Sequence, residues 1–272
     1  MALKTEWVRY GERSGFFAIQ ELAQVPIPSV VVIQEIWGVE EHIQDVTTRV
    51  AAAGYGALAP DLYSLDGERL PPLTGARIEE FQKFMAQLPP ASWRDEGARN
   101  AALAKLPELE RGRISETFAG LFGLTKEQRE AYVTPLREAV RYLRHEREET
   151  KEQPVACVGF CMGGGLAALL ACEEPELSGA AVFYGDTPEP AKLEKIRCPV
   201  VAFYAGNDQR INAGIPAFEQ AMRKIGGDYQ YRVYEGANHS FFNDRRGTYN
   251  VKAARDSFAR LLTFFAETLV RS

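Results

Sequence analysis

The alternation of short apolar strands with amphipathic helices constrains this chain more than any other feature of its sequence. Runs rich in Val, Ile, Ala and aromatic residues predict strands at residues 28–34, 55–59, 154–159, 179–184, 199–204 and 229–234. The middle runs are apolar at nearly every position, which is typical of strands covered on both faces. The sequence therefore predicts an α/β fold with a mostly parallel central sheet flanked by helices.

Apolar residues at helical spacing fill the intervals between these strands. Helices are predicted at residues 43–53, 135–149, 164–172, 215–225 and 251–269. Gly54, Gly226 and Gly227 stand where helices end, because glycine adopts the left-handed conformation of a helix C-terminus without a Cβ penalty. Residues 7–10 and 16–22 alternate between apolar and polar positions, and predict an antiparallel hairpin at the sheet edge.

A long segment, residues 64–133, interrupts the strand and helix pattern. It contains charged stretches that predict helices at residues 76–87 and 97–110. An excursion of this length between a strand and the next βα unit is typical of a lid over a ligand site, and the alternative is a surface decoration that only packs. We expect one domain, residues 1–272, that carries this largely helical, lid-like insertion.

The charge balance excludes several classes of partner. The chain has 37 acidic and 32 basic residues and a formal net charge of −5, which gives no general attraction for nucleic acids or anionic membranes. Lys4, Glu6 and Arg9 interrupt the first ten residues, and no apolar stretch reaches the ~18 residues of a membrane span. We expect a cytoplasmic protein that acts on a small molecule as a monomer or small homo-oligomer.

The use of cysteine indicates reduced thiols. The four cysteines are Cys157, Cys161, Cys172 and Cys198. They are too few and too scattered for a disulfide scaffold in a chain of this length, and no pair has C-x-x-C spacing. With only three histidines in the sequence, we expect no structural metal and no cofactor.

The sharpest local motif is Gly-Phe-Cys-Met-Gly-Gly at residues 159–164. It lies between a predicted strand and a predicted helix, and has the nucleophile-elbow form G-x-Nu-x-G with Cys161 in place of the usual serine. The turn strains the nucleophile, and the helix N-terminus behind it favours the thiolate. A structural cysteine and a phosphate-binding turn are the alternatives, but the motif lies past the midpoint of the chain and centres on a thiol.

A thiol nucleophile requires a base, and His239 is the best placed histidine. It lies in the loop between the last predicted strand and the last predicted helix. His145 sits in a charged helical run and is expected on an exposed face. His42 opens a helix after the 34–38 loop, and is either near the site or an ordinary surface residue.

The orienting acid of an α/β-hydrolase follows a strand and comes between the nucleophile and the histidine in chain order. Asp208 meets both conditions, whereas Asp186 is one strand too early. The alternative for Asp208 is a turn former or helix cap. Two backbone N–H groups are expected to hold the developing oxyanion, those of Met162 and Ile36.

Five segments together resemble the dienelactone hydrolase family of α/β-hydrolases, and the resemblance covers most of the chain outside the insertion. They are Gln-Glu-Ile-Trp-Gly at 34–38, Pro-Asp-Leu-Tyr at 60–63, the motif at 159–164, Gly-Asn-Asp at 206–208, and Asn-His-Ser-Phe at 238–241. The resemblance implies a triad of Cys161, His239 and Asp208 that hydrolyses an ester or lactone.

The resemblance also implies a special role for Glu35, which contacts the resting thiol in the family and takes part in forming the thiolate when substrate binds. A carboxylate beside a thiol favours the neutral form, which protects the thiol from oxidation. The alternative for Glu35 is a capping or surface carboxylate.

Two departures from the family pattern concern the substrate. Asn243 stands where family members often place an arginine, and Arg245 and Arg246 follow it, so either the anion anchor is shifted or the substrate is neutral. Trp37, Arg245 and Arg246 are the candidate substrate-binding residues. The long insertion prevents the assignment of a second arginine, for which the candidates are Arg69 and Arg77.

These residues predict a two-step acyl transfer in which Cys161 attacks a carbonyl and water later releases the acid. The alternative from another class is a thiol-based redox or ligand-sensing protein, although no resolving cysteine is evident near Cys161. A third reading keeps the enzyme and changes its substrate to an acyclic ester or thioester.

Overall fold

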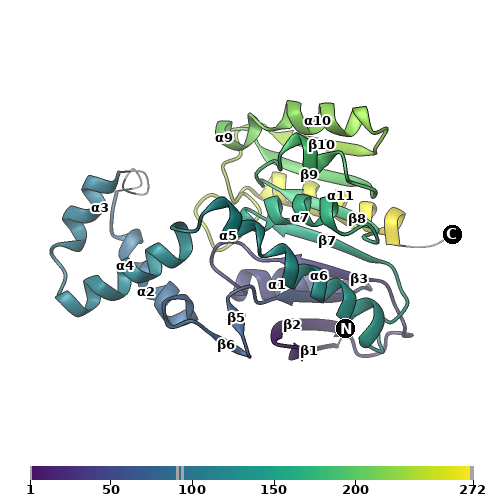
Figure 1. Cartoon of the computed structure of the whole chain (residues 1–272), viewed down its shortest axis with the longest axis horizontal. Coiled ribbons are helices and arrows are strands. Elements are labelled where there is room, and N and C mark those ends of the chain that lie inside the picture. Colours follow the sequence, from purple (N-terminus) through teal and green to yellow (C-terminus); the bar gives the residue numbers. More distant parts are fainter. Residues whose placement is uncertain (1, 90–91, 93–94, 270–272) are drawn as a thin grey trace. The chain divides into compact units, whose positions relative to one another are not determined.

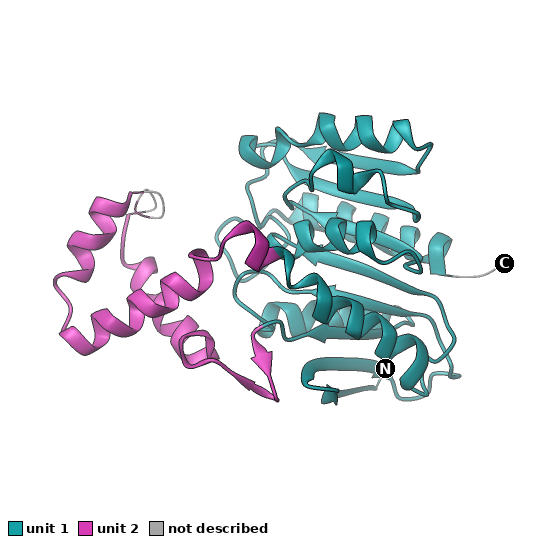
Figure 2. Cartoon of the chain, viewed as in Figure 1, with its two compact units in different colours: residues 1–62, 130–272 teal, residues 63–129 magenta. Residues whose placement is uncertain are grey.

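The computed structural model describes residues 2–89, 92 and 95–269. The chain divides into two compact units (Figure 2). The first consists of Met1–Leu62 and Glu130–Ser272, and the second of Tyr63–Arg129.

The first unit is built on an eight-stranded sheet with the order β1-β2-β4-β3-β7-β8-β9-β10 (Figure 1). The strands are β1 Leu3–Tyr10, β2 Arg13–Gln20, β3 Ser29–Ile33, β4 Gly56–Pro60, β7 Val155–Phe160, β8 Gly179–Phe183, β9 Val200–Ala205 and β10 Tyr229–Tyr234. The β1–β2 and β2–β4 pairs are antiparallel, and all pairs from β4 to β10 are parallel. The predicted parallel sheet and edge hairpin are confirmed.

Helices cover both faces of this sheet, which explains why every residue of β3, β4, β7, β8 and β9 is buried. One core packs under α1 (Glu41–Ala52) and α11 (Val251–Leu269). The other packs under α6 (Val133–Arg141), α7 (Met162–Glu173), α8 (Pro190–Leu193), α9 (Gln209–Asn212) and α10 (Ile215–Lys224). The edge strand β10 has no buried residue.

Glycines end two of the predicted helices. Gly54 and Gly226 have φ of +104° and +66° after α1 and α10, so both predictions of a left-handed helix end are confirmed. The prediction for Gly227 is wrong, since its φ is not positive. Its N–H instead donates to the carbonyl of Met222, and Gly226 alone supplies the left-handed residue of this helix end.

The helix predicted at residues 135–149 ends earlier than expected. After α6 the chain forms a π-helical turn, Tyr142–Glu146, and Arg147 then leaves the helix with extended backbone angles. The Arg147 guanidinium donates to Glu6 and Glu149 at 2.7 and 2.8 Å and lies 3.9 Å from the centroid of the Phe17 ring. These contacts with the sheet hold Arg147 outside the helix.

The second unit is mostly helical. It contains β5 (Ser64–Leu65), β6 (Glu68–Arg69), η1 (Pro71–Leu73), α2 (Gly75–Ala86), α3 (Glu96–Leu103), α4 (Glu108–Phe122) and most of α5 (Lys126–Glu130). The helix expected at residues 76–87 is confirmed. The single helix expected at residues 97–110 is wrong, because α3 ends before Pro107, which lacks an N–H and stands as the N-cap of α4. A lid role for this unit stays a prediction.

None of the helices in the described ranges is both long enough and apolar enough to span a membrane.

Candidate active site

Cys161 occupies a strained turn between β7 and α7. Its φ of +56° and ψ of −115° lie outside the regions that side-chain-bearing residues ordinarily adopt. Its N–H donates to the carbonyl of Phe183 at 3.0 Å, and its own carbonyl accepts from the N–H of Gly164 at 3.0 Å. Such strain persists only where the surroundings fix the backbone, and it is frequent at active sites. The half-buried thiol is thereby held at the carboxyl edge of the sheet.

Three glycines make this turn possible. A Cβ at Gly159 would lie 1.8 Å from the carbonyl oxygen of Gly163. A Cβ at Gly163 would lie 2.4 Å from that of Gln34, and one at Gly164 would lie 2.5 Å from that of Phe183. The elbow therefore packs backbone against backbone, both on itself and on the loop that follows β3.

This packing brings together the two segments that carry the expected oxyanion donors. Met162 is the first residue of α7, where backbone N–H groups have no partner within the helix. Ile36 lies in the loop between β3 and α1, which turns tightly because Gly38 has a φ of +85° and donates to the carbonyl of Glu35. Both donors thus follow parallel neighbouring strands, β3 and β7, at the same edge of the sheet.

His239 and Asp208 are paired across two neighbouring loops. The Nδ1 atom of His239 lies 2.5 Å from Oδ2 of Asp208. Asp208 follows β9, and His239 follows β10, the parallel neighbour of β9. Asn207 ties the loops together, since its backbone N–H donates to Ala237 and its side chain donates to Asn238, both at 3.0 Å.

The side chain of Cys161 also interacts with the imidazole of His239. Burial disfavours the charged imidazolium, but the hydrogen bonds with Asp208 and Cys161 outweigh burial and raise the pKa of His239 to about 10. Burial likewise opposes ionisation of Asp208, yet the hydrogen bond with His239 leaves the pKa of Asp208 below its ordinary value. The structure thus brings the three predicted triad residues into one chain of contacts.

Glu35 lies in a buried polar network beside these residues. Its side chain is 1% exposed. Its Oε2 accepts from the Asn243 amide at 2.9 Å, and its Oε1 accepts from the Tyr184 hydroxyl at 3.4 Å. Burial raises the pKa of Glu35 even though the hydrogen bond from Asn243 acts in the opposite direction. The reading of Glu35 as a surface carboxylate is therefore wrong.

Tyr184 is a site residue that the sequence did not reveal. It follows β8 with a φ of +39°, is fully buried, and its ring centroid lies 5.0 Å from that of His239. Burial, together with the nearby Glu35 and Cys161, raises the pKa of the Tyr184 hydroxyl well above its ordinary value. A tyrosine at the end of an apolar strand is an ordinary sequence feature, so no signal was available.

The arginines near the site are held by residues of the 37–41 segment. The Arg246 guanidinium lies 4.9 Å from the centroid of the Trp37 ring and 3.9 Å from Glu40. The more exposed Arg245 forms an ion pair with Glu41. Of the candidate substrate-binding residues, Arg246 therefore contacts Trp37, whereas Arg245 pairs with Glu41.

The two arginines of the insertion belong to the second unit and make contacts within it. Arg69 lies 5.9 Å from the centroid of the Tyr63 ring. Arg77 donates to the carbonyl of Arg113 and forms a 3.0 Å ion pair with Glu116. Neither contact assigns a role in substrate binding.

The two remaining histidines differ sharply. His145 is exposed as predicted and lies 3.5 Å from Glu152. His42 is only 1% exposed, so the alternative of a surface residue is wrong. Its ring packs edge-on against Phe160 and Phe242, and neither ring nitrogen has a hydrogen-bond partner among the described residues. Burial lowers the pKa of His42 to about 4.

The other three cysteines are buried free thiols, whereas Cys161 is half-exposed. Burial raises the pKa values of Cys172 and Cys198 to about 12, and that of Cys157 well above its ordinary value. Within the described ranges, no group of three or more His, Cys, Asp or Glu residues could hold a metal ion.

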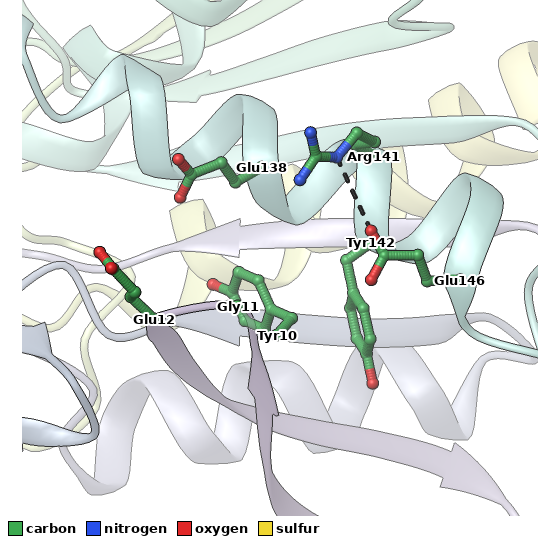
Figure 3. Close-up of a pocket in the computed structure, with 7 residues that line it drawn as sticks. All are labelled: Tyr10, Gly11, Glu12, Glu138, Arg141, Tyr142 and Glu146. Atoms are coloured by element: carbon green, nitrogen blue, oxygen red, sulfur yellow. Dashed lines mark ion pairs between the residues drawn. The ribbon is translucent and has the colours of Figure 1, made fainter.

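A pocket of about 250 Å³ lies elsewhere on the first unit, between the β1–β2 turn and the end of α6 (Figure 3). Its walls are Tyr10, Gly11, Glu12, Glu138, Arg141, Tyr142 and Glu146. The rings of Tyr10 and Tyr142 stack, and Arg141 lies 3.7 Å from Glu146. None of the predicted site residues lines this pocket.

Comparison with known proteins identifies relatives along most of the chain. The sequence profile of the dienelactone hydrolase family matches residues 15–269. A protein of Saccharolobus solfataricus, provisionally named carboxymethylenebutenolidase, is 35% identical over 240 residues, which are 88% of this chain and 89% of that protein. A Yersinia pestis protein with the same provisional name is 28% identical over 253 residues, or 89% of this chain and 79% of that protein.

Solved structures show the same fold. A provisionally assigned dienelactone hydrolase from Klebsiella pneumoniae has a TM-score of 0.73 at 24% identity, covering 98% of this chain and all of that one. A dienelactone hydrolase from Anabaena variabilis has a TM-score of 0.54 at 17% identity, covering 99% of each chain. The predicted α/β-hydrolase fold is confirmed.

The paired histidine generates a prediction about alkaline pH. Replacing Asp208 by Asn removes the charge that stabilises the imidazolium, so the pKa of His239 should fall from about 10 toward 6.5. A pKa raised by folding stabilises the protein below the unfolded value, and this stability is lost as the pH rises through the folded value. The free energy of unfolding, measured in urea, should therefore fall more between pH 6.5 and about 10 in the wild type than in Asp208→Asn.

The matched control is Asp186→Asn, which neutralises an exposed aspartate that follows the neighbouring strand β8. This variant should lose as much stability at alkaline pH as the wild type does. Identical pH dependence in the wild type and in Asp208→Asn would contradict the prediction.

The buried His42 predicts that stability is lost toward acid pH rather than toward alkaline pH. Between pH 6.5 and about 4 the unfolded chain binds a proton that folded His42 does not, so stability is lost as the pH falls through this window. At about 1.4 kcal/mol per pH unit the loss is about 3 kcal/mol. His42→Leu should remove this loss in urea unfolding, while His145→Leu on the surface should retain it. If the free energy of unfolding of His42→Leu fell with decreasing pH as steeply as that of the wild type, His42 would not be the cause of the loss.

Proposed function

This chain belongs to the dienelactone hydrolase family and is an ester or lactone hydrolase, and we propose that it acts through a covalent acyl-enzyme on Cys161. The observation that carries the proposal is the strained Cys161, whose thiol contacts an imidazole oriented by Asp208. This arrangement provides a nucleophile, a base and an orienting acid in the order that α/β-hydrolases use.

In the first step Cys161 reacts as the thiolate while its proton is held on His239, and the sulfur attacks the carbonyl carbon of the substrate. The carbonyl electron pair moves to oxygen, where the N–H groups of Met162 and Ile36 stabilise the charge. When the pair returns, the carbon–oxygen bond to the leaving group breaks and His239 protonates the departing oxygen. The product of this step is a thioester on Cys161.

In the second step His239 takes a proton from water, and the resulting hydroxide attacks the thioester. Collapse of this second intermediate releases the acid and returns the proton to the Cys161–His239 pair. Every proton and electron pair moves among the substrate, water and these two side chains. Asp208 stabilises the imidazolium in both steps through its hydrogen bond with Nδ1.

Two further features bear on the substrate and on the rival function. Trp37 directly follows Ile36 and carries Arg246 over its ring, which supports Trp37 and Arg246 as contacts for the bound acyl group. The name of the curated relatives makes an enol lactone the first substrate to test. A thiol-based sensor is less well supported, because the three other cysteines are buried.

The nucleophile assignment predicts the effect of removing the thiol. Cys161→Ala should lower the turnover of a short p-nitrophenyl ester and of a carboxylate-bearing enol lactone by at least about a thousandfold, since the residual rate comes only from binding and the oxyanion hole. Cys172→Ala is the matched control, because Cys172 is buried in the core, and it should retain turnover. Mass spectrometry of wild type mixed with a slow ester should detect one added acyl group.

Turnover by Cys161→Ala within about tenfold of the wild type would rule out the assignment. Absence of turnover by the wild type with both substrates would instead favour the sensing function.

A further inference from the structure

Strand β10 ends the eight-stranded sheet and is paired on one side only. It runs parallel to β9, and no other strand of the described chain lies beyond it (Figure 1). None of its residues is buried, and Tyr231 is 42% exposed. The register with β9 is unbroken from Tyr229 to Tyr234, and the strand contains no proline. Bulges and prolines keep many edge strands from pairing with another chain, and β10 has neither.

The ladder with β9 determines which backbone groups of β10 face the open side. The carbonyl of Asp228 accepts from the N–H of Val200 at 2.9 Å, so the even-numbered residues direct their backbone groups toward β9. Successive residues of a strand alternate in this respect, and Tyr229, Tyr231 and Val233 therefore direct theirs outward. Within the described residues these outward groups have no hydrogen-bond partner. Such a row of free donors and acceptors is a template for a further strand.

We propose that two copies of this chain form a dimer by pairing their β10 strands in antiparallel orientation across a two-fold axis. Most homo-oligomers have this symmetry, in which one surface patch is complementary to itself. The axis passes between the two copies of Gln230. Each Tyr229 then faces the partner's Tyr231, and each Asp228 faces the partner's Arg232. The dimer does not depend on the chemistry proposed for Cys161.

The charges along the strand select this register. Asp228 and Arg232 are exposed and lie on the same face as Gln230, whose amide is 3.4 Å from the Asp228 carboxylate. With the axis at Gln230 they form two pairs of opposite charge at non-hydrogen-bonded positions, where facing side chains approach most closely. An axis at Arg232 would set two arginines against each other. An axis at Tyr231 would place Arg232 opposite the uncharged Gln230.

Arg232 can turn toward a partner without leaving a charge unpaired in its own chain. Its Nε lies 3.3 Å from Oδ2 of Asp256 in α11. The same carboxylate also accepts from Arg260 and from the hydroxyl of Tyr234, both at 2.8 Å. Asp256 therefore keeps two partners when Arg232 moves, and the half-exposed guanidinium is free to pair with the partner's Asp228.

The other face of the strand supplies aromatic contacts. The ring of Tyr229 stacks on Phe218 of α10 at 4.4 Å between centroids, and the Tyr231 ring follows at 5.6 Å. In the dimer each Tyr229 exchanges both of its backbone hydrogen bonds with the partner's Tyr231. The four tyrosine rings then form one row across the axis, and aromatic cross-strand pairs of this kind stabilise antiparallel sheets.

The test uses two charge reversals and their mixture. Sedimentation velocity should show a dimer of the wild type. Arg232→Glu and Asp228→Lys each convert both opposite-charge pairs into like-charge pairs, so the dimer Kd of each variant alone should rise by at least about tenfold. An equimolar mixture should form a heterodimer with a Kd within about threefold of the wild type. In it the carboxylate introduced by Arg232→Glu faces the ammonium introduced by Asp228→Lys, while the unchanged Asp228 faces the unchanged Arg232.

The matched control is Lys4→Glu, a charge reversal on β1, the strand at the opposite edge of the sheet. Lysine on an edge strand opposes pairing, and the neighbouring Glu6 accepts from Arg147 at 2.7 Å within its own chain. This variant should keep the Kd of the wild type. All three substituted residues are exposed, so the variants are expected to fold, which circular dichroism checks.

Amide hydrogen exchange gives a second readout that does not depend on charge. The N–H groups of Tyr229 and Tyr231 should be protected in the wild type at high concentration and exchange rapidly in Arg232→Glu. Those of Gln230 and Arg232 face β9 and should be protected in both proteins.

The proposal is overturned if the wild type stays monomeric up to about 1 mM, a concentration at which even a weak specific dimer forms. It is also overturned if Arg232→Glu leaves the Kd of a wild-type dimer unchanged, since the contact would then lie elsewhere on the surface. A mixture that associates no more tightly than either variant alone would contradict the proposed pairing of Asp228 with the partner's Arg232.

Discussion

The close packing of backbone around Cys161 is the constraint on which the rest of the site depends. Gly159, Gly163 and Gly164 leave no room for a side chain, so the elbow rests directly on the carbonyl of Gln34 and on the end of β8. The strain at Cys161 is held by the whole parallel sheet, because β7 pairs with β3 on one side and β8 on the other. The same contact that fixes Cys161 therefore also fixes the loop that begins with Gln34 and carries Glu35.

The environment of each histidine decides its chemistry. His239 and His42 are the same residue type, yet a carboxylate and a thiol raise the pKa of His239 to about 10 against the effect of burial, whereas burial without a hydrogen-bond partner lowers the pKa of His42 to about 4. The first environment stabilises the imidazolium form of His239. The second gives a packing residue of α1 whose neutral ring fills the space between Phe160 and Phe242.

Periodicity in the sequence predicted the sheet and most of the helices around it, and chain order predicted that Cys161, Asp208 and His239 lie together. Both succeed because parallel strands bring the loops at their carboxyl ends to one edge, wherever those loops lie in sequence. Pro107 was a local signal of the helix break, since proline lacks the N–H that a helix interior needs. The burial of His42, the positive φ of Tyr184 and the contact between Asn243 and Glu35 depend on tertiary packing, which a pattern of residue types does not encode.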